Sequence, residues 1–350
     1  MDQDGLLLSE ASALKAARKE AGVDNLLAGL AGIVIRVQEN RLNDSVKELV
    51  STTALEHVQS FSRGGFSQAL LQAEKTPTFI VRESKEPSSI RHLNARPRTE
   101  SAPDTRLETF IFETPDIKEL VDIQRGRGVS FTSEIREIGE NLFIRTRPSP
   151  NTHNSVGYVQ FLGEKSFGPK KAAFKPIPKP DNDFIGNIGF LDHAATRITH
   201  ADRIPAILEW MNLTGYDFSE SVYAERFNSI TNVTRLRGRD FAMVLTSGIG
   251  PTAGDRPDPT EKFVRNYGKR VHHLAWQADP IADVFEGLKR EGTGFLLDLV
   301  GGPDEGLMQT FTIPSKNTFL VQEYIHRYGD FDGFFTKDNV TKLTAATDAQ

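Results

Sequence analysis

The chain has 350 residues, with 42 Lys and Arg against 47 Asp and Glu, which gives a formal net charge of -5 at pH 7. Nucleic-acid binders usually carry a basic footprint, so this charge argues against a nucleic-acid partner. The absence of cysteine excludes disulfides, thiolate zinc sites, iron–sulfur clusters and a cysteine nucleophile. The length allows two domains of ordinary size.

The sequence also bears on location. No apolar run is long enough to span a bilayer, and the opening stretch MDQDGLLLSE lacks the basic and long apolar regions of a secretory signal. A chain without cysteine is compatible with a reducing compartment. We therefore expect a cytoplasmic protein with no membrane partner.

The first half of the chain predicts a helical extension followed by strands and helices. Leu, Ala and Lys recur at helical spacing over residues 9–30. β-Branched and apolar runs then predict strands, and amphipathic segments between them predict helices. Strands are expected at 31–38, twice within 68–84, at the start of 107–131 and at 154–163; helices are expected at 41–55 and within 107–131. The proline-containing stretch 85–106 predicts a long loop.

A proline- and lysine-rich segment, FGPKKAAFKPIPKPDN at 167–182, separates the two halves. Repeated proline favours an extended segment that joins neither a helix nor a sheet interior. We place the domain boundary here. The expected organisation is a helical extension at 1–27, a first domain at 28–166, a linker at 167–182 and a second domain at 183–350.

The second half repeats the order of elements in the first. Its strands are expected at 188–198, 240–248, 270–278, 306–313 and 318–327, and its helices at 203–215 and 280–292. LAWQADPIADVFEGLKREGTGF in the second half aligns with FIFETPDIKELVDIQRGRGVSF in the first. Both read as strand, Asp/Pro turn, helix and Gly-x-Gly. The pattern predicts duplicated βαβββ modules whose strands curl around a cavity.

Three residues with metal-binding side chains lie mid-strand in apolar surroundings: His193, His273 (or its neighbour His272) and Glu323. A buried glutamate is costly unless it is paired or binds a metal. Two imidazoles and one carboxylate form a facial triad that leaves positions open on Fe(II). The alternative is that the histidines are half-buried polar residues and that Glu323 pairs with Arg327 or Lys337.

The stretches LDHAATRI, VHHLAWQADPI, EGLMQTFTIPS, VQEYIHRYGDF and FTKDNVTKLTAA resemble the 4-hydroxyphenylpyruvate dioxygenase family of the vicinal oxygen chelate superfamily. In that family the first ligand follows an aspartate, as His193 does here. The second precedes an apolar residue and alanine, which matches His273, and the third is the glutamate of EYIHR, Glu323. The resemblance implies an α+β fold of tandem vicinal oxygen chelate modules. Two open β-barrels would have helices packed outside and a C-terminal helix gating the site.

The resemblance also implies an activity. A small-molecule 2-oxo acid chelates Fe(II), O2 reacts with it, CO2 leaves and the rest of the substrate is oxidised. The substrate supplies its own 2-oxo group, so no separate 2-oxoglutarate is needed. Homo-oligomers are common in the family, so a homo-oligomer is one expected state of this chain.

Five further positions are assigned to the substrate pocket through the resemblance. Gln309 and Phe311 match the family, and Phe311 supplies one aromatic wall. Thr231 and Thr246 stand roughly where polar pocket residues are expected. Val340 takes the place of a second aromatic residue on the gating helix.

Two departures from the family bear on the substrate. The connection between His273 and Glu323 is shorter than is usual, and a tyrosine-containing segment is missing from it. Together with Val340, this favours a different 2-oxo acid, or a different position of hydroxylation on the same acid. Arg235, Arg237 and Arg239 would share one face of an extended segment. They could hold a substrate carboxylate, but a charged edge strand is the favoured interpretation.

Strand alternation predicts that His272 and His273 point to opposite faces. The family register then selects His273 as the ligand, with His272 pointing away from the metal in a structural role. Two other functions are kept as alternatives. One is an extradiol ring-cleaving dioxygenase of the same superfamily, although the stretch before Glu323 argues against it. The other is a non-catalytic binding protein on the same fold.

Overall fold

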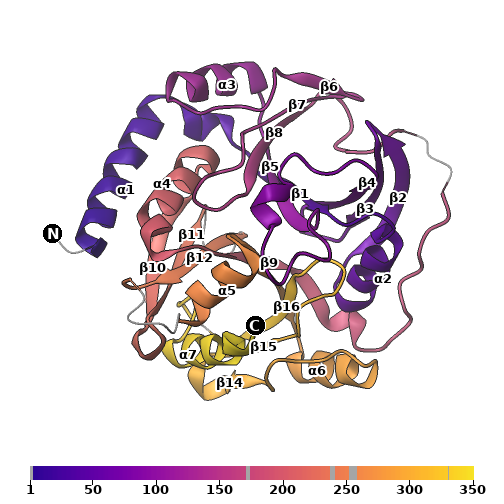
Figure 1. Ribbon diagram of the computed structural model, residues 1–350, viewed down its shortest axis with the longest axis vertical. Coiled ribbons are helices and arrows are strands. Elements are labelled where there is room, and N and C mark those ends of the chain that lie inside the picture. Colours follow the sequence, from indigo (N-terminus) through magenta and orange to yellow (C-terminus); the bar gives the residue numbers. More distant parts are fainter. Residues whose placement is uncertain (1–2, 171–173, 237–240, 252–257, 330) are drawn as a thin grey trace.

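The computed structural model describes residues 3–170, 174–236, 241–251, 258–329 and 331–350. Its strands form two eight-stranded sheets, one from each half of the chain, with equivalent strand order. Figure 1 shows the first half in indigo to magenta and the second in orange to yellow, with helices around the outside of the sheets. The expected α+β fold of tandem curled sheets with outer helices is confirmed.

Each half is built from two βαβββ modules, as the repeat in the sequence predicts. The first half contains β1 (Gly29–Arg36), α2 (Leu42–Thr52), β2 (Glu56–Arg63), β3 (Phe66–Gln72) and β4 (Thr78–Ser84), then β5 (Arg106–Glu113), α3 (Ile117–Gly126), β6 (Arg136–Ile138), β7 (Asn141–Arg145) and β8 (Ser155–Phe161). The second contains β9 (Ile188–Arg197), α4 (Arg203–Thr214), β10 (Asp217–Ala224), β11 (Ser229–Arg235) and β12 (Ala242–Gly248), then β13 (Arg270–Ala278), α6 (Ile281–Arg290), β14 (Val300–Gly302), β15 (Leu307–Phe311) and β16 (Val321–Arg327).

Three helices lie outside these modules: α1 (Gln3–Glu20) before the first, α5 (Pro259–Tyr267) between the third and fourth, and α7 (Lys337–Ala346) after the last. The sequence did not predict α5, nor the strands β2, β6, β7, β10, β11 and β14. Most of the missed strands alternate partly exposed polar residues with few apolar ones, so they lack a continuous apolar run. The domain limits at 28–166 and 183–350 stay predictions.

The central strands of the two sheets follow the same pairing scheme. In the first sheet β1 runs antiparallel to β5, and each has a parallel partner, β4 and β8. In the second sheet β9 runs antiparallel to β13, with β12 and β16 as the parallel partners. Because side chains alternate between faces, every second residue of these strands faces the concave side. That side holds each cavity.

One apolar cluster joins the two halves through the outer faces of the sheets and the helices. Trp276 of β13 is fully buried and lies 5.7 Å from Phe79 of β4, measured between ring centroids. Phe110 of β5 meets Trp210 of α4 at 5.4 Å. The concave faces carry smaller, separate clusters. The shared cluster fixes the two cavities relative to one another.

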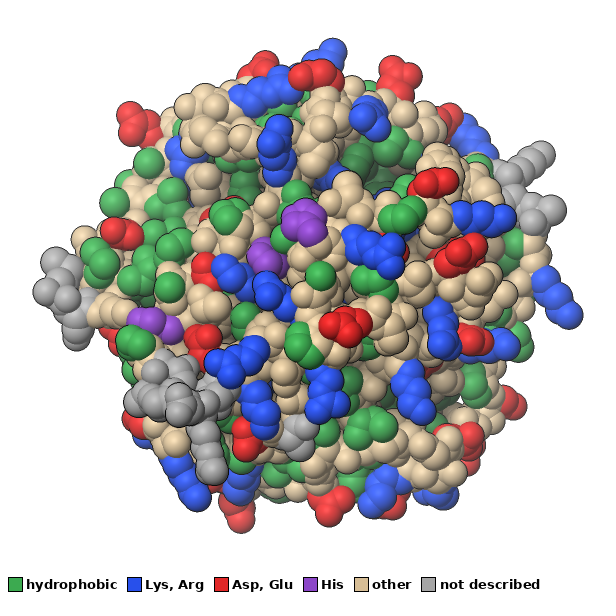
Figure 2. Space-filling model, viewed as in Figure 1, with side chains coloured by type: hydrophobic (Ala, Val, Ile, Leu, Met, Phe, Trp, Pro, Cys, Tyr) green, Lys and Arg blue, Asp and Glu red, His purple; other side chains and the backbone are tan. Residues whose placement is uncertain are grey.

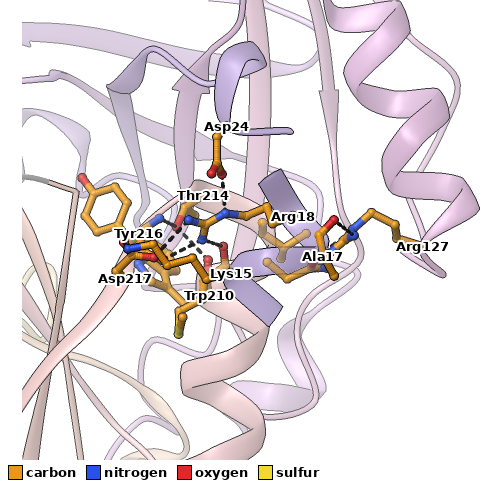
Figure 3. Close-up of polar contacts among 12 residues, drawn as sticks. Lys15, Ala17, Arg18, Asp24, Arg127, Trp210, Thr214, Tyr216 and Asp217 are labelled. Carbon is orange, nitrogen blue, oxygen red and sulfur yellow. Dashed lines mark hydrogen bonds and ion pairs between the residues drawn. The ribbon is translucent and has the colours of Figure 1, made fainter. Parts of the chain in front are cut away.

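The helix α1 belongs to the first half in sequence but packs on the second, beside α4 (Figure 1). Its Arg18 is buried and donates hydrogen bonds to the carbonyl oxygens of Met211 (2.8 Å) and Tyr216 (2.9 Å). Figure 3 shows Arg18 between Asp24 and Asp217, with which it also forms ion pairs. The extension is therefore tied to the half that carries the triad.

The surface mixes charges of both signs. On the face viewed in Figure 2, basic and acidic side chains are interspersed, with hydrophobic side chains scattered between them. Within the described residues, no helix has both the length and the apolar character needed to cross a bilayer.

Candidate metal centre

Three adjacent central strands bring the sequence-predicted triad together. His193 lies on β9, His273 on β13 and Glu323 on β16. The Oε2 atom of Glu323 lies 3.1 Å from Nε2 of each histidine. His193 and Glu323 are buried, and the His273 side chain is 12% exposed. The three side chains therefore converge on one point with one side open to the cavity.

The donor set and its spacing fit a metal ion. His193 Nε2 and Glu323 Oε2 are buried and have no hydrogen-bond partner within the described chain. Ligands about 2.1 Å from a common ion and at right angles to one another would be separated by roughly 3 Å, close to the separation found here. Two imidazoles and one carboxylate match the non-haem Fe(II) facial triad.

The alternative pairing for Glu323 is not formed. Arg327 binds the carboxylate of Asp192 instead, and Lys337 pairs with Glu225 at the surface. An ionised carboxylate that is 1% exposed and lacks a cationic lysine or arginine partner costs several kcal/mol. A metal ion would offset that cost.

His193 is oriented by the residue that precedes it. Its Nδ1 lies 2.7 Å from Asp192 Oδ1, so with Nδ1 protonated it donates to the carboxylate and Nε2 keeps a free lone pair. Arg327 holds Asp192 with two hydrogen bonds of 2.7 and 3.1 Å. Burial alone would lower the pKa of His193, but Glu323 and Asp192 outweigh it and raise that pKa to about 9. Without a metal, Nε2 therefore holds a proton against Glu323, and a metal ion would take the place of that proton.

Glu323 is oriented through Gln309 from α7. Gln309 of β15 donates from Nε2 to Glu323 Oε1. Asn339 of α7 in turn donates from Nδ2 to Gln309 Oε1 at 3.0 Å. Gln309 and Asn339 are both fully buried. Gln309 therefore connects the carboxylate to α7, which agrees with its assignment to the site.

The two neighbouring histidines lie closer together than strand alternation predicts. The pairing of β13 with β9 skips His272, because Val271 pairs with Thr196 and His273 with Ala195. A bulge of this kind breaks the alternation of faces. The two Nδ1 atoms are 2.8 Å apart, and His272 is 1% exposed. The prediction that His272 and His273 point to opposite faces of the strand is therefore wrong.

A directed chain of hydrogen bonds follows from this contact. For Nε2 of His273 to bind a metal, its Nδ1 must carry the proton and donate to Nδ1 of His272. His272 then carries its own proton on Nε2, which lies 2.9 Å from Gln350 Oε1. Burial lowers the pKa of both histidines well below the usual value, which keeps both neutral. His272 thus fixes the tautomer that His273 needs as a ligand.

His273 and Glu323 of the triad line a small cavity with about 40 Å³ of free volume. All five pocket positions predicted from the sequence line it, namely Thr231, Thr246, Gln309, Phe311 and Val340. Their roles toward a substrate stay predictions. Arg235 lies on β11 with its guanidinium over the ring of Phe334, 5.7 Å from the centroid. Arg237 and Arg239 lie outside the described residues.

The sequence did not single out two further residues that line this cavity, Phe335 and Arg197. Phe335 precedes α7, and its ring centroid lies 5.3 Å from that of His193. It supplies a second aromatic wall that was expected on the helix itself. Arg197 lies four residues after His193 on β9, on the same face. Alternation along LDHAATR could have identified it.

No family model and no curated protein matches the chain. Solved structures do match the chain. A triple mutant of 4-hydroxymandelate synthase from Streptomyces coelicolor matches with a TM-score of 0.69 and 16% identity, over 93% of this chain and 99% of that chain. A fusion of a xylose isomerase-like TIM barrel with 4-hydroxyphenylpyruvate dioxygenase matches with a TM-score of 0.64 and 14% identity, over 93% of this chain and 53% of the fusion.

A halotolerant catechol dioxygenase matches with a TM-score of 0.54 and 10% identity, over 88% of this chain and 91% of that chain. Identities this low establish the fold and not the reaction. The strand order, the four modules and these neighbours agree. The chain therefore has the vicinal oxygen chelate fold in its tandem form, and its resemblance to the 4-hydroxyphenylpyruvate dioxygenase family is confirmed as a likeness of fold.

Proposed function

We propose that the protein is an Fe(II)-dependent dioxygenase that oxidatively decarboxylates a 2-oxo acid. The observation that carries this proposal is the buried site of His193, His273 and Glu323, open on one side to a cavity. A dioxygenase activity is also supported by two structural neighbours, the fusion that contains 4-hydroxyphenylpyruvate dioxygenase and the halotolerant catechol dioxygenase.

The three side chains would hold the metal from the sheet, and the cavity beside them would admit substrate and O2. When bound, Fe(II) would supply the site for chelating the 2-oxo acid and for activating O2. In the overall reaction CO2 leaves, one oxygen atom enters the new carboxylate, and the other is inserted into the rest of the substrate. The 2-oxo group comes from the substrate itself.

The chain's own residues orient the ligands and exclude water. Asp192 and His272 hold the tautomers of the two histidines, and Gln309 holds one oxygen of Glu323. Phe311 and Phe335 line the cavity beside the triad. Their rings would shield the substrate from water and position a flat or apolar group between them.

The test uses protein purified anaerobically, stripped of metal and reloaded with Fe(II). Aromatic and aliphatic 2-oxo acids are screened for O2 consumption and CO2 release. We expect at least one to give both, in equal amounts. His193→Ala should abolish turnover, while Thr109→Ala, in the first half, should leave it unchanged.

The alternatives predict different results. Ring cleavage of catechols with no reaction of 2-oxo acids would replace the proposal by an extradiol dioxygenase. Stoichiometric Fe(II) binding without O2 consumption on either class would favour a non-catalytic binding protein. As parts of the same proposal, the enzyme acts in the cytoplasm on a small molecule, the catalytic domain is 183–350, and a homo-oligomer is one expected state.

A further inference from the structure

Arg197 is a buried cation in the candidate pocket that has no acidic partner among the described residues. It is 5% exposed, and its Nη1 makes no hydrogen bond there. Nη2 donates to Thr347 Oγ1 at 2.7 Å, and the guanidinium lies 4.9 Å from the ring centroid of Phe263. Burial lowers the pKa of Arg197 to about 9. A buried guanidinium is normally paired with an anion.

The register of the second sheet places Arg197 at a defined distance from the metal site. His193, Ala195 and Arg197 lie on the concave face of β9 at two-residue intervals. Four residues of a strand span roughly 13 Å. Arg197 therefore lies two rows from His193 and one row from His273, which pairs with Ala195.

Residues that pair across neighbouring strands form a row across the sheet. Arg197 pairs with Thr246, which pairs with Thr231, so the far row offers one guanidinium and two hydroxyl groups.

Ala195 pairs with Val244, which pairs with Val233, so on the β12 side the middle row is apolar and its side chains are small. On the β13 side Ala195 pairs with the ligand His273. The cavity thus offers the metal site, an apolar side next to it and, one row beyond His273, a cationic end.

We propose that the substrate carries a second acid group, a carboxylate, on the end away from its 2-oxo group, and that Arg197 binds it. This rests on the proposed function, because it assumes that the 2-oxo end lies at the triad. Thr231 and Thr246 add hydrogen bonds from the same row. The apolar side of the cavity suits one ring or a short carbon chain, so the substrate is an aryl or alkyl 2-oxo diacid.

A structural role for Arg197 makes a different prediction. Through Thr347 it ties the segment after α7 to β9. If that were its whole purpose, Thr347→Val would cost as much stability as Arg197→Met, and neither would change ligand preference.

The experiment compares 4-carboxyphenylpyruvate with phenylpyruvate, which differ only in the distal carboxylate. Binding is measured by calorimetry without O2, on protein loaded with Co(II) so that no turnover occurs. A charge-assisted hydrogen bond in a buried site predicts roughly 10–100-fold tighter binding of the diacid. Arg197→Met should remove this preference, and Arg197→Lys should keep part of it. Arg265→Met, an exposed residue of α5, should keep all of it.

If Arg197→Met does not fold, the double variant Thr231→Val/Thr246→Val measures the same row and should reduce the preference. Equal binding of the two acids by the wild type, or an undiminished preference in Arg197→Met, would overturn the inference while the proposed function stands. Benzoate, added to metal-free protein, distinguishes a failure of this inference from a failure of the proposed function. If no 2-oxo acid binds but benzoate binds the wild type and not Arg197→Met, the anion site stands and the proposed function fails.

Discussion

The two halves of the molecule share one topology, yet only the second carries the triad. The pairing of β1 with β5 and of β5 with β8 aligns Gly32, Thr109 and Gly157 with His193, His273 and Glu323. Two of the three positions in the first half are glycine.

Phenylalanine rings occupy the space beside both glycines. A Cβ on Gly32 would lie 2.9 Å from Phe167 Cζ, and one on Gly157 would lie 3.0 Å from Phe143 Cε2. The first half therefore shows this fold with the ligand positions replaced, although its cavity of about 570 Å³ is larger than the one beside the triad. The second half has kept all three ligands, which argues against a vestigial site there.

The two halves have an arginine at one equivalent position, Arg36 in the first and Arg197 in the second. Arg36 pairs with Arg106 at the end of β1, as Arg197 pairs with Arg270 at the end of β9. In the first half the buried carboxylate of Glu108 is bound by two other arginines, Arg82 and Arg145. The first cavity thus holds its own counter-ion, whereas the second has none for Arg197 among the described residues.

The sharpest test of the comparison removes the ligand Glu323 from the second half and, in the first half, truncates Thr109, the counterpart of the ligand His273. Glu323→Ala should lower Co(II) or Fe(II) affinity by more than about 100-fold, the upper range for residues that only support a ligand. Thr109→Ala should leave affinity unchanged, because that half has no site. Calorimetry and metal analysis of the dialysed proteins measure both. Retention of stoichiometric metal by Glu323→Ala would refute the ligand assignment.

Glu108→Gln tests whether the first cavity depends on its internal ion pairs. Burial would raise the pKa of Glu108, but Arg82 and Arg145 outweigh it and lower it from 4.5 to about 2. Because the folded-state pKa is depressed, the stabilisation is present above pH 4.5 and is lost as the pH falls toward 2.

The expected loss of unfolding free energy in Glu108→Gln is about 3 kcal/mol at pH 7, and less near pH 3. Urea denaturation at both pH values measures it. Glu225→Gln, at an exposed ion pair, should have a much smaller effect on stability. A loss that is the same at pH 3 and pH 7 would contradict the electrostatic explanation.

His272→Ala tests the bulge that joins the two histidines. Without the acceptor for His273 Nδ1–H, metal affinity should fall by about 10–100-fold while three ligands remain. His272→Asn offers an acceptor oxygen and should recover part of the loss. Unchanged affinity in His272→Ala, measured on folded protein, would return His272 to the purely structural role that alternation predicts.

The smallest expected effect comes from adding a side chain at Gly157, the position of the first half that corresponds to the ligand Glu323. Gly157→Ala places a methyl group against Phe143 and should cost about 1–2 kcal/mol of unfolding free energy. Gly186→Ala is a matched control, because no heavy atom lies within 4 Å of its Cβ. Thermal denaturation compares the two. Equal stability of both variants would show that Phe143 is not packed tightly against Gly157.

Much of this could be predicted from the sequence, but for identifiable reasons not all of it. Continuous apolar runs predicted the central strands, and the resemblance pointed to His193, His273 and Glu323. Arg197 meets Thr347 across 150 positions of the chain, a contact that no local pattern contains. The bulge at His272 adds one residue to a strand without any change of composition. Edge strands such as β10 lack an apolar run because one side is exposed.

The contact between Trp276 and Phe79 has a consequence for how the protein can evolve. Since one apolar cluster passes through both sheets, the half without ligands forms part of the wall that supports the half with them. Deleting it would expose the back of β13, the strand that carries His273. Natural selection can therefore erase the chemistry of the first half, residue by residue, but it must keep the scaffold.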